Sequence, residues 1–223
     1  MRYRARLCLL VLCTLVLEGC ASTPKAESVE GELRGMVYDI DRQPILDATV
    51  TVAGPDRLSG LTDLHGRFGV APVRFGEVTL EVMKPGYEPI HWTFQFRNSA
   101  QVVYLQLASI DQLFDRAAAA LEKKDWRTFQ LFLERAKKLA PSSLQGVILE
   151  ATGLELHGDL DGAIGILENE QPEQPVLALE LFLGDLYAKR GDDQKAISHW
   201  TSALAIREDS TVRAKIEKLK AGK

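Results

Sequence analysis

The chain has 223 residues, enough for one or two domains. Hydrophobic residues make up 46% and charged residues 26%, which is the balance of a folded protein rather than a disordered one. The 27 Lys and Arg residues against 31 Asp and Glu residues give a net charge of −4, which disfavours a nucleic-acid-binding protein. All three cysteines (Cys8, Cys13 and Cys20) lie at the start, which excludes a disulfide, a cysteine-ligated zinc or a cysteine nucleophile further along.

Residues 1–19 have the organisation of a secretory signal peptide. Three arginines, Arg2, Arg4 and Arg6, precede the apolar run 7–17. A helix of that length, at about 1.5 Å per residue, is too short to cross a bilayer core of about 30 Å. A basic start followed by a short apolar stretch therefore predicts a cleaved leader rather than a membrane span.

The leader ends in Leu17-Glu18-Gly19-Cys20, which resembles the lipobox of bacterial lipoproteins. The resemblance implies that Cys20 is lipidated and that the protein is held on a membrane of the cell envelope. Ala21 rather than Asp follows the cysteine, which favours the outer membrane, facing the periplasm. The alternative is an ordinary signal peptide with a chance cysteine. Residues 20–32 are then the lipidated cysteine and a small, polar tether.

Residues 33–107 have the two-residue period of β-strands. Apolar and polar side chains alternate in the segments 48–52, 78–82 and 90–96, and turn-forming residues separate the runs. In the last of these segments Trp92, Phe94 and Phe96 are expected to form a buried row. About seven short strands with this punctuation predict an all-β sandwich.

The same segment resembles the carboxypeptidase regulatory-like domain, which has a transthyretin-like fold. The family pattern is matched at fixed spacing by Gly35, Val37, Asp39, Pro44, Ala48, Val50, Val52, Thr62, Asp63, Gly66, Phe68, Val70, Gly76, Val78, Leu80, Val82, Gly86 and Tyr87. Gln43 stands where the family usually has Gly, so the first turn is expected to differ in shape. The resemblance implies an accessory domain without catalytic residues of its own.

From residue 110 onward the hydrophobic period becomes helical. Short turn signals at Lys124-Asp125, Gly158-Asp159 and Gly191-Asp192 recur at spacings of 34 and 33 residues. Small and large residues recur around them, with Gly184 and Trp200 in the best-matched unit. This pattern resembles tetratricopeptide repeats (TPR), in which small residues of one helix pack against large residues of its partner.

The expected architecture is a β-sandwich followed by an all-α TPR array of about seven helices. The predicted helical domain, 110–223, contains the units 110–143, 144–176 and 177–210 and a capping helix over 211–219. We expect the two domains to fold separately, with a boundary near Ala108-Ser109, where the period changes.

The sequence contains no motif of a known catalytic or phosphate-binding site, so we expect neither an enzyme nor a cofactor. The four histidines, His65, His91, His157 and His199, lack the spacing of metal ligands and are interpreted as solvated side chains. The aspartates around the first turn, Asp39, Asp41 and Asp47, could bind calcium, but we interpret them as Asx-turn residues that hydrogen-bond the local backbone.

The resemblance to TPR proteins implies a concave peptide-binding face on the first helix of each pair. The matching positions are Phe114, Ala118, Leu121, Ile148, Thr152, Glu155, Leu181, Asp185 and Lys189, and the same correspondence includes Asp111, Glu122, Gln145, Leu156, Ala178 and Ala188. This face is apolar with scattered acidic residues, which favours a hydrophobic or basic partner segment. The alternative is that Phe114, Ile148 and Leu181 only pack within the protein.

Two functions follow from these features. The first is a non-enzymatic lipoprotein adaptor or scaffold that binds an envelope protein or peptide segment and contacts the membrane through its lipid. The second is a cell-wall or carbohydrate-binding accessory protein that uses the β-sandwich. The buried aromatic row expected in segment 90–96 favours the first.

Overall fold

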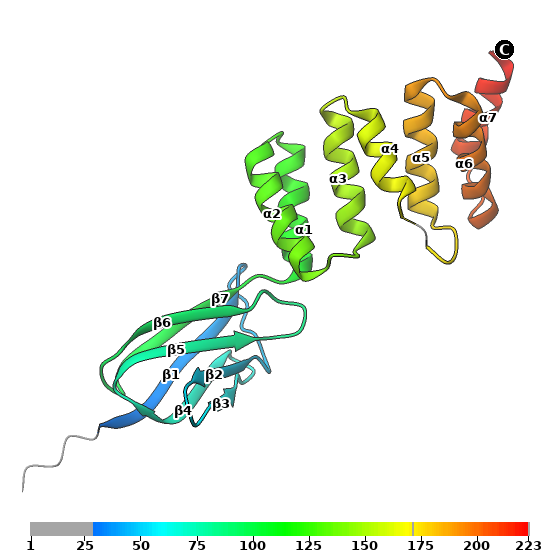
Figure 1. Cartoon of the computed structure of the whole chain (residues 1–223). Helices are drawn as coiled ribbons and strands as arrows, with labels where there is room; N and C mark the ends of the chain where they lie inside the picture. The colour runs from blue at the N-terminus through cyan, green and yellow to red at the C-terminus, as the bar shows by residue number, and fades with distance from the viewer. Residues whose placement is uncertain (1–28, 171, 223) are drawn as a thin grey trace, which may run out of the picture.

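The computed structural model describes residues 29–170 and 172–222 (Figure 1). The predicted signal peptide, Cys20 and residues 21–28 of the predicted tether lie outside these residues. The described chain forms two regions: a β-region over 30–107 with seven strands, followed by a helical region over 110–221 with seven helices. Both numbers agree with the sequence prediction.

The β-region consists of two sheets. One has the strand order β4-β1-β7 and the other β3-β2-β5-β6. The strands are β1 (Glu30–Asp39), β2 (Thr49–Ala53), β3 (Leu58–Leu61), β4 (Arg67–Arg74), β5 (Gly76–Met83), β6 (Ile90–Phe96) and β7 (Val102–Leu107). Strand β1 begins three residues before the predicted domain start, because Glu30 and Gly31 pair with Arg74 and Val73 of β4.

The two sheets share one hydrophobic core, and the two-residue period explains which side chains fill it. Val78, Leu80 and Val82 of β5 are buried, and so are Leu33 and Val37 of β1. The residues between them face outward, where Thr79 and Thr93 of neighbouring strands are hydrogen-bonded at 2.7 Å. The predicted alternation is confirmed for these strands.

The predicted aromatic row is wrong at one end. Phe96 is buried, but Trp92 is 39% exposed and Phe94 is only partly buried. Trp92 pairs with Leu80 and so lies on the core side of its sheet, with its ring stacked on Phe94 at 4.4 Å. Strand β6 is an edge strand of the four-stranded sheet, and the opposing sheet has only three strands. The edge position explains the exposure of Trp92.

The helices form antiparallel pairs that follow the predicted units. They are α1 (Ile110–Glu122), α2 (Trp126–Leu139), α3 (Leu144–Leu156), α4 (Leu160–Glu168), α5 (Leu177–Arg190), α6 (Asp193–Ile206) and α7 (Ser210–Ala221). The aspartate of each turn signal is the N-cap of the following helix: the side chains of Asp125, Asp159 and Asp192 accept backbone N–H bonds of 2.8–3.2 Å. The recurring signal in the sequence is therefore a capping signal.

Small-to-large packing within a pair is clearest in α5 and α6. A Cβ atom added to Gly184 would lie 2.3 Å from the ring of Trp200, so the indole rests directly on the α5 backbone. Helix α7 places Val212 and Ile216 in the same apolar cluster at the end of the array, where the sequence predicts a capping helix. It is slightly longer than the predicted 211–219, and Asp209 is its N-cap.

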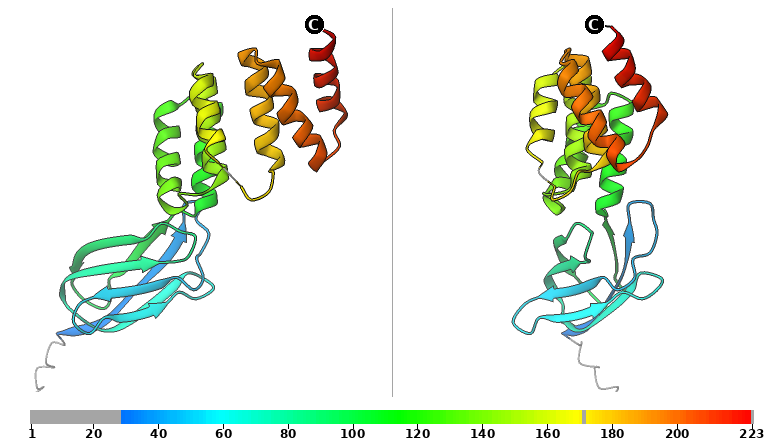
Figure 2. Two further views of the ribbon diagram at one scale, coloured as in Figure 1. Left: turned by 45° about the vertical axis from the view of Figure 1, so that its right-hand side comes forward. Right: turned by 90° about the vertical axis from the view of Figure 1, so that its right-hand side faces the viewer.

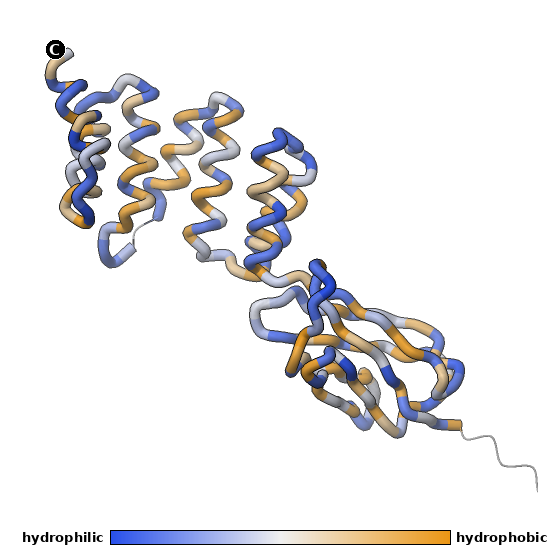
Figure 3. The backbone as a smooth tube through the Cα atoms, turned by 180° about the vertical axis from the view of Figure 1, so that it is seen from behind, coloured by the Kyte–Doolittle hydropathy of each residue, from blue (hydrophilic) through white to orange (hydrophobic). Residues whose placement is uncertain are grey.

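The helices stand in a row that extends away from the β-region, with α7 at the far end (Figure 2). Hydrophobic residues recur along each helix and alternate along the strands (Figure 3). The described chain enters the β-region at the end opposite to the helices (Figure 1). The β-region therefore separates the incoming chain from the helical array.

Candidate protein-binding surfaces

The predicted binding residues lie on the first helix of each pair, and α3 and α5 carry half-buried apolar side chains among them. We call this the first-helix surface, defined by the residues Ile148, Thr152, Glu155 and Leu156 of α3 and Leu181, Asp185 and Lys189 of α5. Ile148 and Leu181 pack partly against the core of the array, whereas Leu156 is 52% exposed. Leu156 therefore offers accessible apolar area at one end of the α3 portion of this surface.

The charged side chains of the first-helix surface are paired between neighbouring units. Glu155 of α3 accepts an ion-pair hydrogen bond from Lys189 of α5. Asp185 of α5 binds Lys215 of α7 at 2.6 Å and also accepts a 3.1 Å hydrogen bond from the Trp200 indole. These carboxylates already have cationic partners, so the expected preference for a basic partner loses its physical basis. The apolar side chains remain as the available contacts.

Part of the predicted face belongs to the core. Phe114 is 1% exposed and Leu121 is also buried, both in the cluster that joins α1 to α2. The ring of Phe114 lies against α3 at Gly146, where an added Cβ would meet it at 3.3 Å. Helix α3 can cover Phe114 because Gly146 has no side chain. Phe114 and Leu121 are therefore core residues rather than binding residues. Ala118 is half-buried.

Thr152 also has a local role. Its hydroxyl donates a 2.7 Å hydrogen bond to the carbonyl oxygen of Ile148, one turn earlier in α3. The burial of Phe114 and Leu121 reduces the predicted face on α1, and on α3 and α5 the face stays a prediction.

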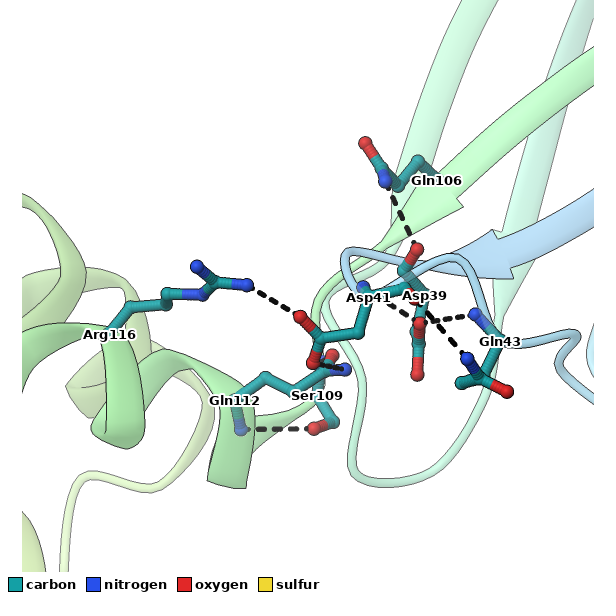
Figure 4. Close-up of polar contacts among 7 residues, drawn as sticks. All are labelled: Asp39, Asp41, Gln43, Gln106, Ser109, Gln112 and Arg116. Carbon is teal, nitrogen blue, oxygen red and sulfur yellow. Dashed lines mark hydrogen bonds and ion pairs between the residues drawn. The ribbon is translucent and has the colours of Figure 1, made fainter.

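The joint between the two regions was not foreseen from the sequence (Figure 4). Asp41, in the turn after β1, accepts a 2.7 Å hydrogen bond from the Gln112 amide and a 2.5 Å ion pair from Arg116, both on α1. Asp39 alone has the predicted Asx-turn role, since its carboxylate accepts the backbone N–H groups of Asp41 and Gln43. Asp41 is therefore a contact between regions, which corrects its interpretation as a local turn residue.

Backbone hydrogen bonds complete the joint. The Glu88 N–H donates to the Ala108 carbonyl and the Ile110 N–H donates to the Gly86 carbonyl, each at 2.9 Å. Ala108, at the predicted boundary, is 2% exposed and belongs to the apolar cluster of α1 and α2. The connection between the regions is therefore short, buried and hydrogen-bonded.

The histidines differ from their predicted role at one position. His199 is half-buried, with its ring stacked on Tyr187 at 5.4 Å and Nδ1 2.8 Å from a carboxylate oxygen of Glu180. Nearby, Lys195 donates a 3.0 Å hydrogen bond to the Tyr187 hydroxyl, which raises the pKa of Lys195. Within residues 29–170 and 172–222 there is no group of three His, Cys, Asp or Glu side chains that could hold a metal ion.

The described helices include none that is both long and apolar enough to span a bilayer. Every buried side-chain nitrogen or oxygen in the described part of the chain has a hydrogen-bond partner. Three candidate binding surfaces on the described residues are the first-helix surface, the exposed aromatic edge of β6 and the neighbourhood of the joint.

No protein-family model matches the chain, and no curated protein matches it. The solved N-terminal domain of stress-induced protein-1 from C. elegans is similar to 50% of this chain over 94% of its own length, with 16% identity and a TM-score of 0.42. The type III secretion chaperone SycD of Yersinia enterocolitica, in complex with a peptide of the translocator YopD, is similar to 51% of this chain over 93% of its own length, with 12% identity and a TM-score of 0.42. A thermophilic TPR protein of Thermus thermophilus is similar to 51% of this chain over 65% of its own length, with 20% identity and a TM-score of 0.44.

Proposed function

We propose that the chain is a non-enzymatic lipoprotein adaptor of the bacterial cell envelope, which holds a segment of a partner protein on its first-helix surface. The observation that carries the proposal is the apolar strip of α3 and α5, where Leu156 is exposed and the neighbouring charges are already paired. Water in contact with such a strip is displaced favourably by an apolar partner side chain.

We assign the helical region to the TPR class on its repeat spacing and on the packing of Trp200 over Gly184. We assign the β-region to the transthyretin-like sandwiches of carboxypeptidase regulatory-like domains, on the matched residues and the two sheets that share one core. In this proposal the β-region is a spacer. Strand β1 alone, ten residues long, spans about 30 Å between the incoming chain and the joint.

The membrane anchor in this proposal is Cys20, and the location is the periplasmic side of the outer membrane. Two or three acyl chains hold a protein stably on a bilayer. The variant Cys20→Ser lacks the thiol that would be acylated, so it should move from the membrane fraction to the soluble fraction. Extraction of the unaltered protein without detergent would contradict the anchor and leave the adaptor role to be judged separately.

The adaptor role is tested by crosslinking at two matched positions. Leu156 on α3 and Leu131 on α2 are 52% and 54% exposed, but only Leu156 belongs to the first-helix surface. A photoreactive residue at 156 should crosslink one discrete partner in the native cells, and the same residue at 131 should not. Leu156→Glu should abolish that crosslink at a neighbouring photoreactive position, 152, because burying an unpaired carboxylate is unfavourable. Equal crosslinking from positions 131 and 156 would contradict the proposal.

The second candidate, carbohydrate or cell-wall binding by the β-region, is favoured by the exposure of Trp92. An accessible indole stacked on Phe94 provides a flat apolar face for a sugar ring. Soluble peptidoglycan fragments should then change the tryptophan fluorescence of the protein, and Trp92→Phe should remove that change while Trp126 and Trp200 remain. An unchanged spectrum would exclude this candidate.

A further inference from the structure

The joint between the two regions is bordered by a cleft of about 590 Å³. Its walls come from α1 and α2 on one side and from the end of β7 and the turn after β1 on the other. Ile40 and Phe132, both partly buried, supply its apolar lining, and Arg116, Lys123 and Arg135 supply positive charge. A second cleft of about 430 Å³ shares Gln106, Ala108 and Arg135 with the first, and Lys138 and Leu139 of α2 line it further along. We call the two together the joint groove.

The residues that line the joint groove include four cations (Arg116, Lys123, Arg135 and Lys138) and two carboxylates (Asp125 and Glu88). Asp125 is the acidic residue that lines the larger cleft, and its carboxylate is engaged in capping α2. The hydrogen bonds from the Thr128 side chain and backbone N–H lower the pKa of Asp125. Arg116 and Arg135 have one carboxylate partner each, Asp41 and Glu88. Lys123 and Lys138 form no ion pair of 4 Å or less within the described residues, although the charge of Lys123 also helps to lower the pKa of Asp125.

This local positive charge lies on a chain whose net charge is −4. The groove is therefore an exception to the overall electrostatic character of the protein. Opposite charge on a partner would both steer it to this groove and favour its binding there.

The positions of the cations define the shape of the ligand. Lys123 precedes the first turn of α2 and Lys138 lies in its last turn, so they are separated by about 20 Å along the helix. Phe132 lies between them, with the Arg135 guanidinium 5.2 Å from its ring centre. A compact anion would need hydrogen-bond donors that converge on one point, whereas the cationic side chains of the groove are distributed along the length of α2. An extended chain covers the same length with about six residues.

We propose that the joint groove binds an extended acidic segment of a partner protein, about six residues long, with an apolar side chain at its middle. The acidic residues pair with Lys123 at one end and Lys138 at the other, and the apolar side chain contacts Phe132 and Ile40. This surface is distinct from the first-helix surface, so one chain can hold two segments at once.

The test uses the full chain and three fluorescent hexapeptides in an anisotropy titration. One has four Glu residues around a central Leu-Phe pair, one has Lys in place of Glu, and one is hexaglutamate. We expect the first to bind, the basic peptide not to bind, and hexaglutamate to bind at least about tenfold more weakly because it lacks the apolar contact. Raising the salt concentration should weaken binding of the first peptide.

Variants locate the binding. Lys123→Glu and Lys138→Glu should each weaken the first peptide about tenfold or more, since each replaces an attraction by a repulsion. Lys220→Glu on α7 makes the same change in net charge far from the groove and should leave binding within about twofold. Leu156→Glu should also leave it unchanged, which separates this proposal from the adaptor role of the first-helix surface. Circular dichroism confirms that each variant is folded.

Three outcomes would overturn the proposal. The first is no binding of the acidic apolar peptide. The second is equal binding of hexaglutamate, which would mean a site for any polyanion. The third is an equal loss in Lys220→Glu and Lys123→Glu, which would mean that net charge alone determines binding.

Discussion

The guanidinium of Arg135 on α2 donates two hydrogen bonds to the carboxylate of Glu88, 47 residues earlier in the chain. Nε lies 3.0 Å from Oε1, and Nη2 lies 2.5 Å from Oε2. This fork-like pairing raises the pKa of Arg135 and is a second side-chain contact between the helical region and the β-region, besides the Gln112–Asp41 hydrogen bond. Both side chains are more than half buried. The pair therefore contributes to the orientation of the helical array on the β-region.

Removing the guanidinium should loosen the joint. Arg135→Met keeps an apolar stem but leaves the Glu88 carboxylate without its partner, which should cost roughly 1.5–3 kcal/mol in urea unfolding. Chymotrypsin should then cleave after Leu107 faster than in the unaltered protein, where Leu107 and Ala108 are buried. Arg127→Met, on the same helix and without an ion pair in the described residues, is the control. Unchanged cleavage in Arg135→Met would mean that the backbone hydrogen bonds alone hold the joint.

Glycines on two helices should respond in opposite directions to alanine. Gly184→Ala places a methyl group where Trp200 lies, 2.3 Å away, and the buried indole has little room to move. We expect a loss of roughly 1–3 kcal/mol by overpacking. Gly165 on α4 has no atom within 4 Å of an added Cβ, so Gly165→Ala should instead stabilise the protein by up to about 1 kcal/mol through helix propensity. Thermal unfolding of both variants measures the contrast, and two shifts of the same sign would contradict the assigned packing.

Local patterns predicted the elements, whereas contacts between distant segments decided the sites. The strand and helix periods and the recurring turn signals depend on a few neighbouring residues, and they predicted the seven strands and seven helices; that Asp125, Asp159 and Asp192 are N-caps is seen only in the structure. The burial of Phe114 depends on the absence of a side chain at Gly146 in α3, and the exposure of Trp92 depends on the position of β6 at a sheet edge. The pairing of Arg116 with Asp41 joins residues 75 positions apart. No local period encodes such contacts.

Two aromatic residues of β6 should differ in their importance for stability. Phe96 is buried, whereas Trp92 is 39% exposed at the sheet edge. Phe96→Ala should cost about 3–5 kcal/mol, the usual range for a buried aromatic side chain. Trp92→Ala should cost much less, because its ring is already partly in water and its main contact is the stacked ring of Phe94. Urea unfolding measures the free energy of unfolding of both variants. Equal losses would mean that Trp92 is as buried as Phe96, as the sequence predicts.

The capping carboxylate of α7 should make stability depend on pH. The Asp209 side chain accepts backbone N–H bonds from Thr211 at 2.8 Å and from Val212 at 3.2 Å. These bonds, that of Val212 first, lower the pKa of Asp209 below its ordinary value. A carboxyl whose pKa is lower in the folded state stabilises the fold above its unfolded pKa of about 4, and this contribution is lost as the pH falls through the folded pKa.

Asp209→Asn should therefore flatten the pH dependence of unfolding. Asn still caps a helix, but it lacks the charge that interacts with the helix dipole. At neutral pH the variant should be less stable than the unaltered protein, and the difference should shrink between about pH 5 and about pH 2, as Asp209 becomes protonated. Glu217→Gln, in the middle of the same exposed helix, removes one carboxylate without touching the cap and should not reproduce the effect. A difference between Asp209→Asn and the unaltered protein that stays constant over this range would show that the charge of Asp209 contributes nothing to the stability of α7.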